Sequence, residues 1–284
     1  MRGDTPSMTA RKAALNVLSL GAKPEMQAVL PSGVVDATAR LLVAADVVNR
    51  SAVRFARTRV AAAIYESFDW MMPGQFESFA HRKAFCEKQA RDGIAAGAEQ
   101  VLVLGAGYDT LGWRLAPKFS TVRFHEIDRP ATGKRKARGI DSLGPRDNLH
   151  LIQADLGDRR LEDVLAAVDS WDRTAPSVVI AEGLTQYLAP ASVRDLFVQC
   201  GAATGSDSRI AFTYVGTGDD GRPDVGRWTA LVLWLLDNSG EPWDWSIRPD
   251  ELPRFLAETG WSHAPDLTAR PDRHGVEYYA VASH

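Results

Sequence analysis

The sequence predicts an α/β fold in which a mostly parallel sheet carries helices on both faces. From Gln100 onwards, short apolar runs alternate with longer amphipathic stretches, which is the pattern of strands connected by helices. The first of these runs also leads directly into a glycine-rich turn, as in many ligand-binding α/β proteins. The predicted strands cover residues 101–104, 122–127, 149–153, 178–181, 210–215 and 276–281.

The chain before the first strand has a different pattern. Ala, Arg and Val recur there at helical spacing, and strand-like runs are few. We therefore predict a helical N-terminal region over residues 1–97 and the sheet-containing core over residues 98–284. The predicted helices of the first region include residues 35–49, 56–67 and 76–96, with Pro73 and Gly74 as a break before the last of them.

An insertion is predicted between the fifth strand and the last one, at about residues 216–245. Its beginning contains Gly216, Gly218, Gly221 and Gly226, and an apolar segment over residues 228–236 follows. Glycines at the edges of a helix permit hinge motion. We interpret the insertion as a lid with one helix.

Composition excludes several classes of function. The chain has 284 residues and a formal net charge of −3, without the block of Lys and Arg that follows a nucleic-acid backbone. No apolar stretch approaches the roughly 20 residues that span a bilayer. Its two cysteines, Cys86 and Cys200, are too far apart for a CxxC motif, which fits a reducing, cytoplasmic setting. The six histidines form no HxH or HExxH pattern, so no metal site is indicated.

The glycine-rich turn after the first strand reads Gly105-Ala106-Gly107-Tyr108. Glycines at these positions let a ligand approach the backbone, where a Cβ atom would clash. A dinucleotide site would also have glycine three residues after Gly107, to bring the helix close behind a pyrophosphate. That position is Thr110. The turn therefore favours a cofactor without pyrophosphate over a nicotinamide dinucleotide, and an ordinary strand–helix connection is the structural alternative.

Acidic residues follow at the ends of the next three strands. Glu126 and Asp128 lie on one side of the second strand, and either carboxylate could accept the ribose hydroxyls of an adenosine, with Asp128 closer to the strand end. The third strand ends at Asp155, whose carboxylate could accept from the adenine amine, and the fourth ends at Glu182. Strand ends of an open α/β sheet converge on one crevice, so these residues predict a single site, in which Glu182 could hold the α-amino group of a methionine moiety or face the acceptor.

Four motifs resemble the leucine carboxyl methyltransferase family, including its bacterial O-methyltransferases. They are LGAGYDTLGWRL at residues 104–115, FHEIDRP at 124–130, ADL at 154–156 and AEGLTQYL at 181–188, joined by GEPW at 240–243. The resemblance covers about residues 79–245 and is weak before Phe76. It implies the Rossmann-like fold of class I methyltransferases, with S-adenosyl-L-methionine as cofactor.

The same resemblance implies roles for individual residues. The cofactor would contact the turn at Gly105, Ala106, Gly107 and Tyr108, the acid Asp128, the adenine-binding pair Asp155 and Leu156, and Glu182. By its position on the helix before the first strand, Arg82 corresponds to the family's arginine for the cofactor carboxylate, because a guanidinium binds a carboxylate through two hydrogen bonds. The alternatives are a surface role for Arg82, or Arg57 or Arg59 in its place.

The expected activity is methyl transfer to an oxygen of a small, largely apolar molecule, such as a secondary metabolite. A carboxylate acceptor is ionised at neutral pH and needs no general base, whereas a phenol usually does. We therefore favour a carboxylate or acidic hydroxyl and assign no catalytic side chain. Tyr187, Trp228 and Trp243 are the candidates for contact with this substrate, beneath the lid and the N-terminal cap. The alternative is a cofactor-binding partner protein without catalysis, and the oligomeric state is left open.

Overall fold

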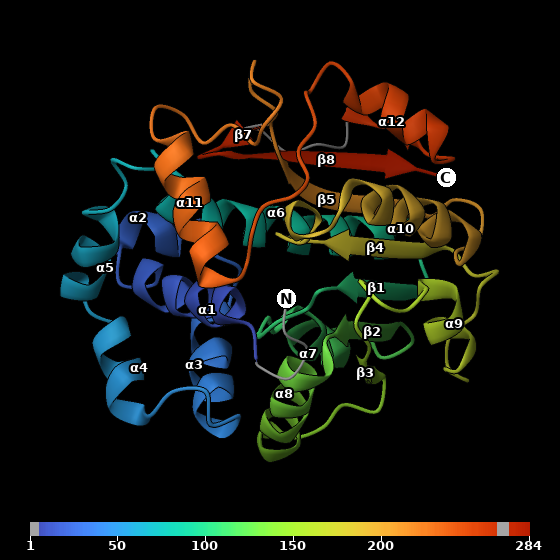
Figure 1. Cartoon of the computed structure of the whole chain (residues 1–284). Coiled ribbons are helices and arrows are strands. Elements are labelled where there is room, and N and C mark those ends of the chain that lie inside the picture. The colour runs from blue at the N-terminus through green and yellow to red at the C-terminus, as the bar shows by residue number, and fades with distance from the viewer. Residues whose placement is uncertain (1–5, 266–272) are drawn as a thin grey trace.

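A computed structural model describes residues 6–265 and 273–284, which form one eight-stranded sheet with helices around it (Figure 1). The strand order is β3-β2-β1-β4-β5-β8-β6, and β7 pairs with β8 beyond this path. The strands are β1 Gln100–Leu104, β2 Arg123–Asp128, β3 Leu149–Gln153, β4 Ser177–Ala181, β5 Arg209–Val215, β6 Ser262–His263, β7 Arg273–His274 and β8 Glu277–Ser283.

Strands β1 to β5 are parallel, and β8 runs antiparallel to β5, β6 and β7. The predicted mostly parallel sheet is therefore confirmed. The chain reverses its direction of strand addition at β1, which lies between β2 and β4. At such a switch point the loops after neighbouring strands diverge and leave a crevice at the carboxyl ends of the strands.

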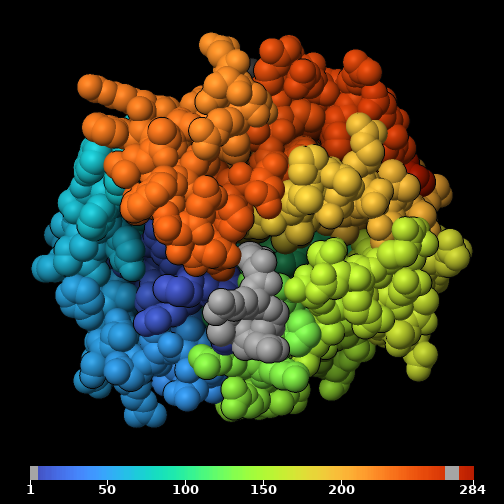
Figure 2. Space-filling model, viewed as in Figure 1, coloured from blue at the N-terminus to red at the C-terminus, as the bar shows by residue number. Residues whose placement is uncertain are grey.

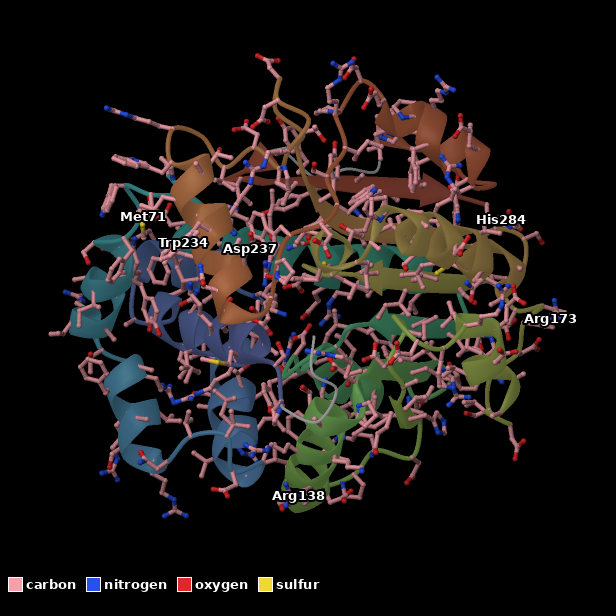
Figure 3. The ribbon with its side chains drawn as sticks, in the orientation of Figure 1. Met71, Arg138, Arg173, Trp234, Asp237 and His284 are labelled. Carbon is pink, nitrogen blue, oxygen red and sulfur yellow. The ribbon has the colours of Figure 1, made fainter. Side chains whose placement is uncertain are left out.

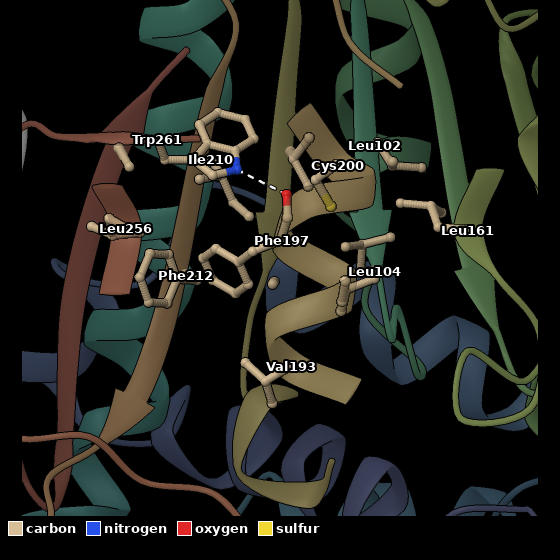
Figure 4. Close-up of a cluster of buried hydrophobic side chains, with 14 of the residues drawn as sticks. Leu102, Leu104, Leu161, Val193, Phe197, Cys200, Ile210, Phe212, Leu256 and Trp261 are labelled. Carbon is tan, nitrogen blue, oxygen red and sulfur yellow. Dashed lines mark hydrogen bonds between the residues drawn. The ribbon is translucent and has the colours of Figure 1, made fainter. Parts of the chain in front are cut away.

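Alternate residues of the central strand β1 point to opposite faces of the sheet, and an apolar cluster covers each face. Leu102 and Leu104 of β1 belong to one apolar cluster, and Val101 and Val103 belong to another. The first cluster includes Phe197 of α10, and Figure 4 shows it together with the hydrogen bond of 2.9 Å from the Trp261 indole nitrogen to the Phe197 carbonyl. The core helices are α7 Leu111–Leu115, α8 Pro130–Leu143, α9 Leu161–Ala166, α10 Pro190–Ala202, α11 Thr229–Ser239 and α12 Leu252–Glu258, with the 3-10 helices η1 Ala116–Lys118 and η2 Thr185–Tyr187.

Helices α1 to α6 precede the sheet; α1 to α5 lie to the left of it in Figure 1, and α6 runs behind it. They are α1 Met8–Leu20, α2 Pro24–Gln27, α3 Val34–Ala44, α4 Arg50–Ala56, α5 Arg59–Glu66 and α6 Gln75–Ala95. Two of the predicted helices have different bounds. The predicted helix 35–49 ends at Ala44 because Asp46 has a positive φ of 53° and Asn49 caps the next helix. The predicted helix 56–67 begins only after Thr58, whose side chain accepts a hydrogen bond from the Ala61 amide.

None of the described helices is long and apolar enough to cross a membrane.

A buried histidine on β2 makes stability depend on pH. His125 is fully buried, its Nε2 lies 2.9 Å from the Ser170 hydroxyl, and its ring stacks on His150. Burial, with His150 and Arg123 nearby, lowers the pKa of His125 from 6.5 to about 3. In the unfolded chain His125 therefore binds a proton near pH 6.5, whereas in the folded chain it stays neutral down to about pH 3. The contribution of the neutral His125 to stability is complete above pH 6.5 and is lost as the pH decreases towards 3.

We expect the free energy of unfolding to fall by about 1 kcal/mol per pH unit between pH 6.5 and pH 5 through His125 alone, because the unfolded histidine becomes progressively protonated over this range. Urea unfolding at pH 7, 6 and 5 measures this slope. His125→Gln should flatten it, whereas His263→Gln on the edge strand β6 controls for the loss of a histidine. An unchanged slope in a folded His125→Gln variant would contradict the prediction.

Candidate active site

A cavity opens at the carboxyl ends of β1 to β4, between the core and helix α1. Figure 2 shows a hollow in this face beside the orange segment that contains α11. Most of the site residues predicted from the sequence line the cavity, namely Arg82, Gly105, Ala106, Gly107, Tyr108, Asp128, Asp155, Leu156, Glu182 and Tyr187. The strand topology thus brings together residues that are up to 105 positions apart in the chain.

The glycine-rich turn leaves β1 with two left-handed residues, Gly105 at φ 63° and Gly107 at φ 48°. Space is limited as well as conformation. A Cβ atom on Gly105 would lie 2.9 Å from a methyl carbon of Leu184, and one on Gly107 would lie 3.1 Å from the Cβ of Ala10. Glycine is therefore required at both positions, and their backbone atoms form one wall of the cavity.

Of the two acids on β2, Asp128 lines the cavity and Glu126 does not. The Asp128 carboxylate accepts hydrogen bonds from the backbone amides of Gly107 and Arg129, and burial raises its pKa. Glu126 instead accepts from the Gly112 amide at 3.1 Å and forms a buried ion pair of 2.7 Å with Lys136 of α8. The structure thus places Asp128 at the cavity, whereas Glu126 is bonded to the start of α7 and to α8.

Asp155 and Leu156 follow β3 at the adjoining edge of the cavity. The Asp155 carboxylate accepts from the Gly157 amide at 2.9 Å, which fixes the side chain at the start of the connection to α9. Its second oxygen remains available for a donor, as a carboxylate has about four acceptor positions.

Arg82 of α6 is buried and holds two carboxylates from distant parts of the chain. Its Nε donates to Glu182 after β4 at 2.8 Å, and its Nη1 donates to Glu277 of β8 at 2.9 and 3.2 Å. The guanidinium also lies over the ring of Phe79, 4.2 Å from its centroid. The alternatives Arg57 and Arg59 are exposed and do not line the cavity, and Arg57 pairs with Asp36.

Lys83 extends this buried network of charges. Its ammonium lies 3.0 Å from Glu182 and 3.1 Å from Asp109, the residue that follows the glycine-rich turn. Burial alone would raise the pKa of Asp109, but Lys83, with Arg114 and Lys136, lowers it to about 2. Asp109 is therefore ionised at neutral pH. Two cations and three carboxylates meet at this end of the cavity, which suits a ligand carrying both an ammonium and a carboxylate group.

The opposite wall is formed by the start of α1, which is fastened by Glu241 from the predicted lid. The Glu241 carboxylate accepts from the Ser7 hydroxyl and the Thr9 amide, both at 2.9 Å, and from the Thr9 hydroxyl. Ser7 also caps α1 by accepting from the Ala10 amide at 3.0 Å. Ser7, Thr9 and Glu241 all line the cavity. We call these three residues the clamp.

The three candidates for substrate contact are not placed alike. Tyr187 lines the cavity, and burial raises the pKa of its phenol. Trp243 lies behind it, with ring centroids 6.4 Å apart, and packs against the cluster of Val225, Val232 and Val276. Trp228 contacts Trp70 on the surface. Neither tryptophan is among the lining residues, so the structure does not bring them to the cavity.

The family model of leucine carboxyl methyltransferases matches residues 24–201, which is more than half of the chain and includes the glycine-rich turn and all three strand-end acids. The chain belongs to the leucine carboxyl methyltransferase family.

Relatives of this leucine carboxyl methyltransferase family member carry consistent names. A protein of Mycolicibacterium paratuberculosis, named an S-adenosyl-L-methionine-dependent methyltransferase, is 29% identical over 245 residues, covering 78% of this chain and 76% of its own length. A Mycolicibacterium smegmatis protein with the same name is 29% identical, over 73% of this chain and 70% of its own. A second M. paratuberculosis relative is matched over 61% of its length.

Solved structures agree on the fold. A Thermobifida fusca structure titled as a methyltransferase covers 92% of this chain and 97% of its own with a TM-score of 0.57, at 18% identity. The Streptomyces avermitilis structure of a DUF574 family protein covers 87% of this chain and 96% of its own, also at 0.57, with 15% identity. The class I methyltransferase fold predicted from the sequence is confirmed.

The family member is thus an S-adenosyl-L-methionine-dependent methyltransferase, and the nicotinamide alternative is set aside. The cavity fits this cofactor by the chemistry of its donors and acceptors. It offers the backbone of Gly105 and Gly107 as one wall, the carboxylates of Asp128 and Asp155, and the charged network beyond. Hydroxyl and amine groups of an adenosine are donors that such carboxylates accept.

The residues of the cavity and its charged network that were not predicted from the sequence include Lys83, Asp109, Glu241 and Glu277. Asp109 carried a signal, since it belongs to the turn motif, and Lys83 adjoins Arg82. Glu241 stands in the GEPW motif, but nothing in the sequence connects it with Ser7, 234 positions earlier. Glu277 is the first residue of β8, whose sequence is that of an ordinary buried strand. Its ion pair with Arg82 therefore becomes apparent only in the folded structure.

Proposed function

We propose that this methyltransferase transfers the methyl group to an oxygen of a small, largely apolar carboxylic acid or acidic hydroxyl compound. The observation that supports this acceptor is the set of titratable side chains in the cavity. They are Arg82, Lys83, Arg129, Asp109, Asp128, Asp155, Glu182, Glu241, Tyr108 and Tyr187.

These groups provide no strong base at neutral pH. A carboxylate is a weak base towards an alcohol or a phenol, whose own pKa is near 10 or higher. Burial raises the pKa of both Tyr108 and Tyr187, which therefore keep their protons. An acceptor that ionises by itself in water, such as a carboxylic acid, needs no base from the protein.

The lining beside the charged network favours an apolar body on the acceptor. Ala13 and Val17 of α1 face this part of the cavity, together with Leu184 and Leu188 after β4. Burying apolar surface contributes about 25 cal/mol per Å² to binding. In this proposal the helical region 1–97 and the insertion 216–245 enclose the acceptor, and Tyr187 contacts it.

S-adenosyl-L-methionine supplies a methyl group that is already activated by the sulfonium. Asp128 would accept from the ribose hydroxyls, Asp155 from the adenine amine, and Glu182 from the α-amino group, while Arg82 would bind the carboxylate. The remaining task of the protein is to hold the acceptor oxygen close to the methyl carbon and to exclude water. The clamp supports this role, because it fastens α1 across the cavity.

We expect methyl transfer to small apolar carboxylic acids to give products that mild alkali hydrolyses, because methyl esters are labile under these conditions and methyl ethers are not. The measurement uses isotopically labelled methyl donor with matched pairs of acids and alcohols of equal carbon number. Label retained after alkali would move the activity to a hydroxyl acceptor. Tight cofactor binding without transfer to any acceptor would favour a cofactor-binding partner protein instead.

A further inference from the structure

An exposed apolar surface lies on and beside α11. It consists of Phe68, Trp70, Trp228, Leu231, Trp234 and Leu235, which are between 36% and 59% exposed. We call it the lid patch. Trp70 and Trp228 meet edge to face with ring centroids 5.0 Å apart, so the α5–α6 connection and α11 form one continuous surface. Contiguous apolar surfaces of this kind mark interaction sites.

Helix α11 is apolar on two faces, but the chain covers only one. Val232 and Leu233 are its buried residues, and Val232 packs with Val225 and Val276. Trp234, labelled in Figure 3, is 59% exposed on the other side. A helix that is apolar on all sides is normally buried, so the outer face of α11 requires a partner.

The charges of α11 indicate what that partner is. Arg227 directly precedes the helix and Asp237 lies in its last turn, which is the reverse of what the helix dipole favours. Within residues 6–265 and 273–284, no ion pair satisfies either of them. The two residues are ten positions apart, or about 15 Å along the helix axis.

A second copy of the same helix, running antiparallel about a two-fold axis, would place Arg227 of each copy beside Asp237 of the other. The axis would cross the outer face of α11 at the height of residue 232, and the bulky Trp234 would then face the small, exposed Ala230. Such self-complementarity is the property of an isologous interface. A helix that binds a lipid surface would instead have several Lys or Arg residues along its polar edge. Here one positive charge, Arg227, precedes α11, and one negative charge, Asp237, lies near its end.

We propose that this chain forms a two-fold dimer through the lid patch, with α11 packed antiparallel against α11 of the second copy. Six half-exposed large side chains provide on the order of a few hundred Å² per copy, and a standard interface of roughly 800 Å² per copy would also include residues around the lid patch. The dimer would join the two lids, so each insertion would be held by the other copy.

Sedimentation velocity of the full chain tests the proposal. We expect a dimer for the wild type, and at least tenfold weaker association for Arg227→Asp and for Asp237→Arg, because each homodimer then juxtaposes like charges. An equimolar mixture of these two variants should dimerise again, since both ion pairs are restored in the heterodimer. Trp234→Glu should be monomeric, and thermal unfolding establishes that all three variants are folded.

Several results would overturn the proposal. One is a wild type that stays monomeric at every concentration, and another is a dimer that none of the variants weakens. Failure of the mixed variants to associate would exclude the antiparallel pairing of Arg227 with Asp237. Sedimentation of monomeric wild type with phosphatidylglycerol vesicles would assign the lid patch to a membrane surface instead.

Discussion

Replacing Glu277 with glutamine is expected to lower the free energy of unfolding by about 3 kcal/mol, because removing one partner of a buried ion pair leaves the other charge poorly compensated. Glu277 is 1% exposed, and its carboxylate holds Arg82 through two contacts. Arg82 retains Glu182, so the effect should lie at the lower end of the range for such losses. Urea unfolding monitored by circular dichroism measures it.

Glu258→Gln is the matched control for that variant. Glu258 pairs with Arg194 and Arg254 on the surface, where solvent screens the charges, so its loss should change stability little. Equal destabilisation by the two substitutions would mean that burial of the Arg82 ion pairs contributes nothing to the free energy of unfolding beyond that of a surface ion pair. A Glu277→Gln protein as stable as the wild type would lead to the same conclusion.

Asp128→Ala is expected to weaken S-adenosyl-L-methionine binding roughly ten- to hundredfold, or about 1.5–3 kcal/mol, because a charge-assisted acceptor is lost. The same carboxylate also fixes the Gly107 amide, so the turn loses a local partner as well. Isothermal titration calorimetry measures the affinity. The ligand-induced increase in thermal stability reports the same loss independently.

Asp158→Ala provides the comparison, since Asp158 is exposed and lies three residues beyond Asp155. Its affinity should equal that of the wild type. Asp128→Asn keeps an acceptor oxygen without the charge, so its affinity for the cofactor should fall between those of Asp128→Ala and the wild type. If folded Asp128→Ala bound the cofactor as tightly as Asp158→Ala, Asp128 would not be the ribose acid.

The buried strands of the sheet could be predicted closely from the sequence. The run predicted at residues 149–153 coincides with β3, those for β1, β4 and β5 begin one residue late, and that for β2 is shifted by one residue at both ends. Such strands are apolar on both faces and therefore stand out. The two-residue strands β6 and β7 have no such run, and only their pairing with β8 defines them.

The cofactor side of the site was predictable because sheet topology determines where strand ends lie. Asp128 and Asp155 line one cavity for that reason, whatever their separation in sequence. The acceptor side depends on how helices pack, which a local pattern does not determine. Trp228 and Trp243 were chosen for their aromatic character, yet packing places one on the surface and the other behind Tyr187.

The position of β8 has a consequence for the order in which the site forms during synthesis. The strand is made after all of its neighbours in the sheet. It joins the free edge of β5, and the short strands β6 and β7 then pair with it. Until then the nascent chain contains Arg82 and Glu182 without Glu277. Affinity for the cofactor should therefore arise late, when the last strand joins the sheet, and not when the glycine-rich turn first folds.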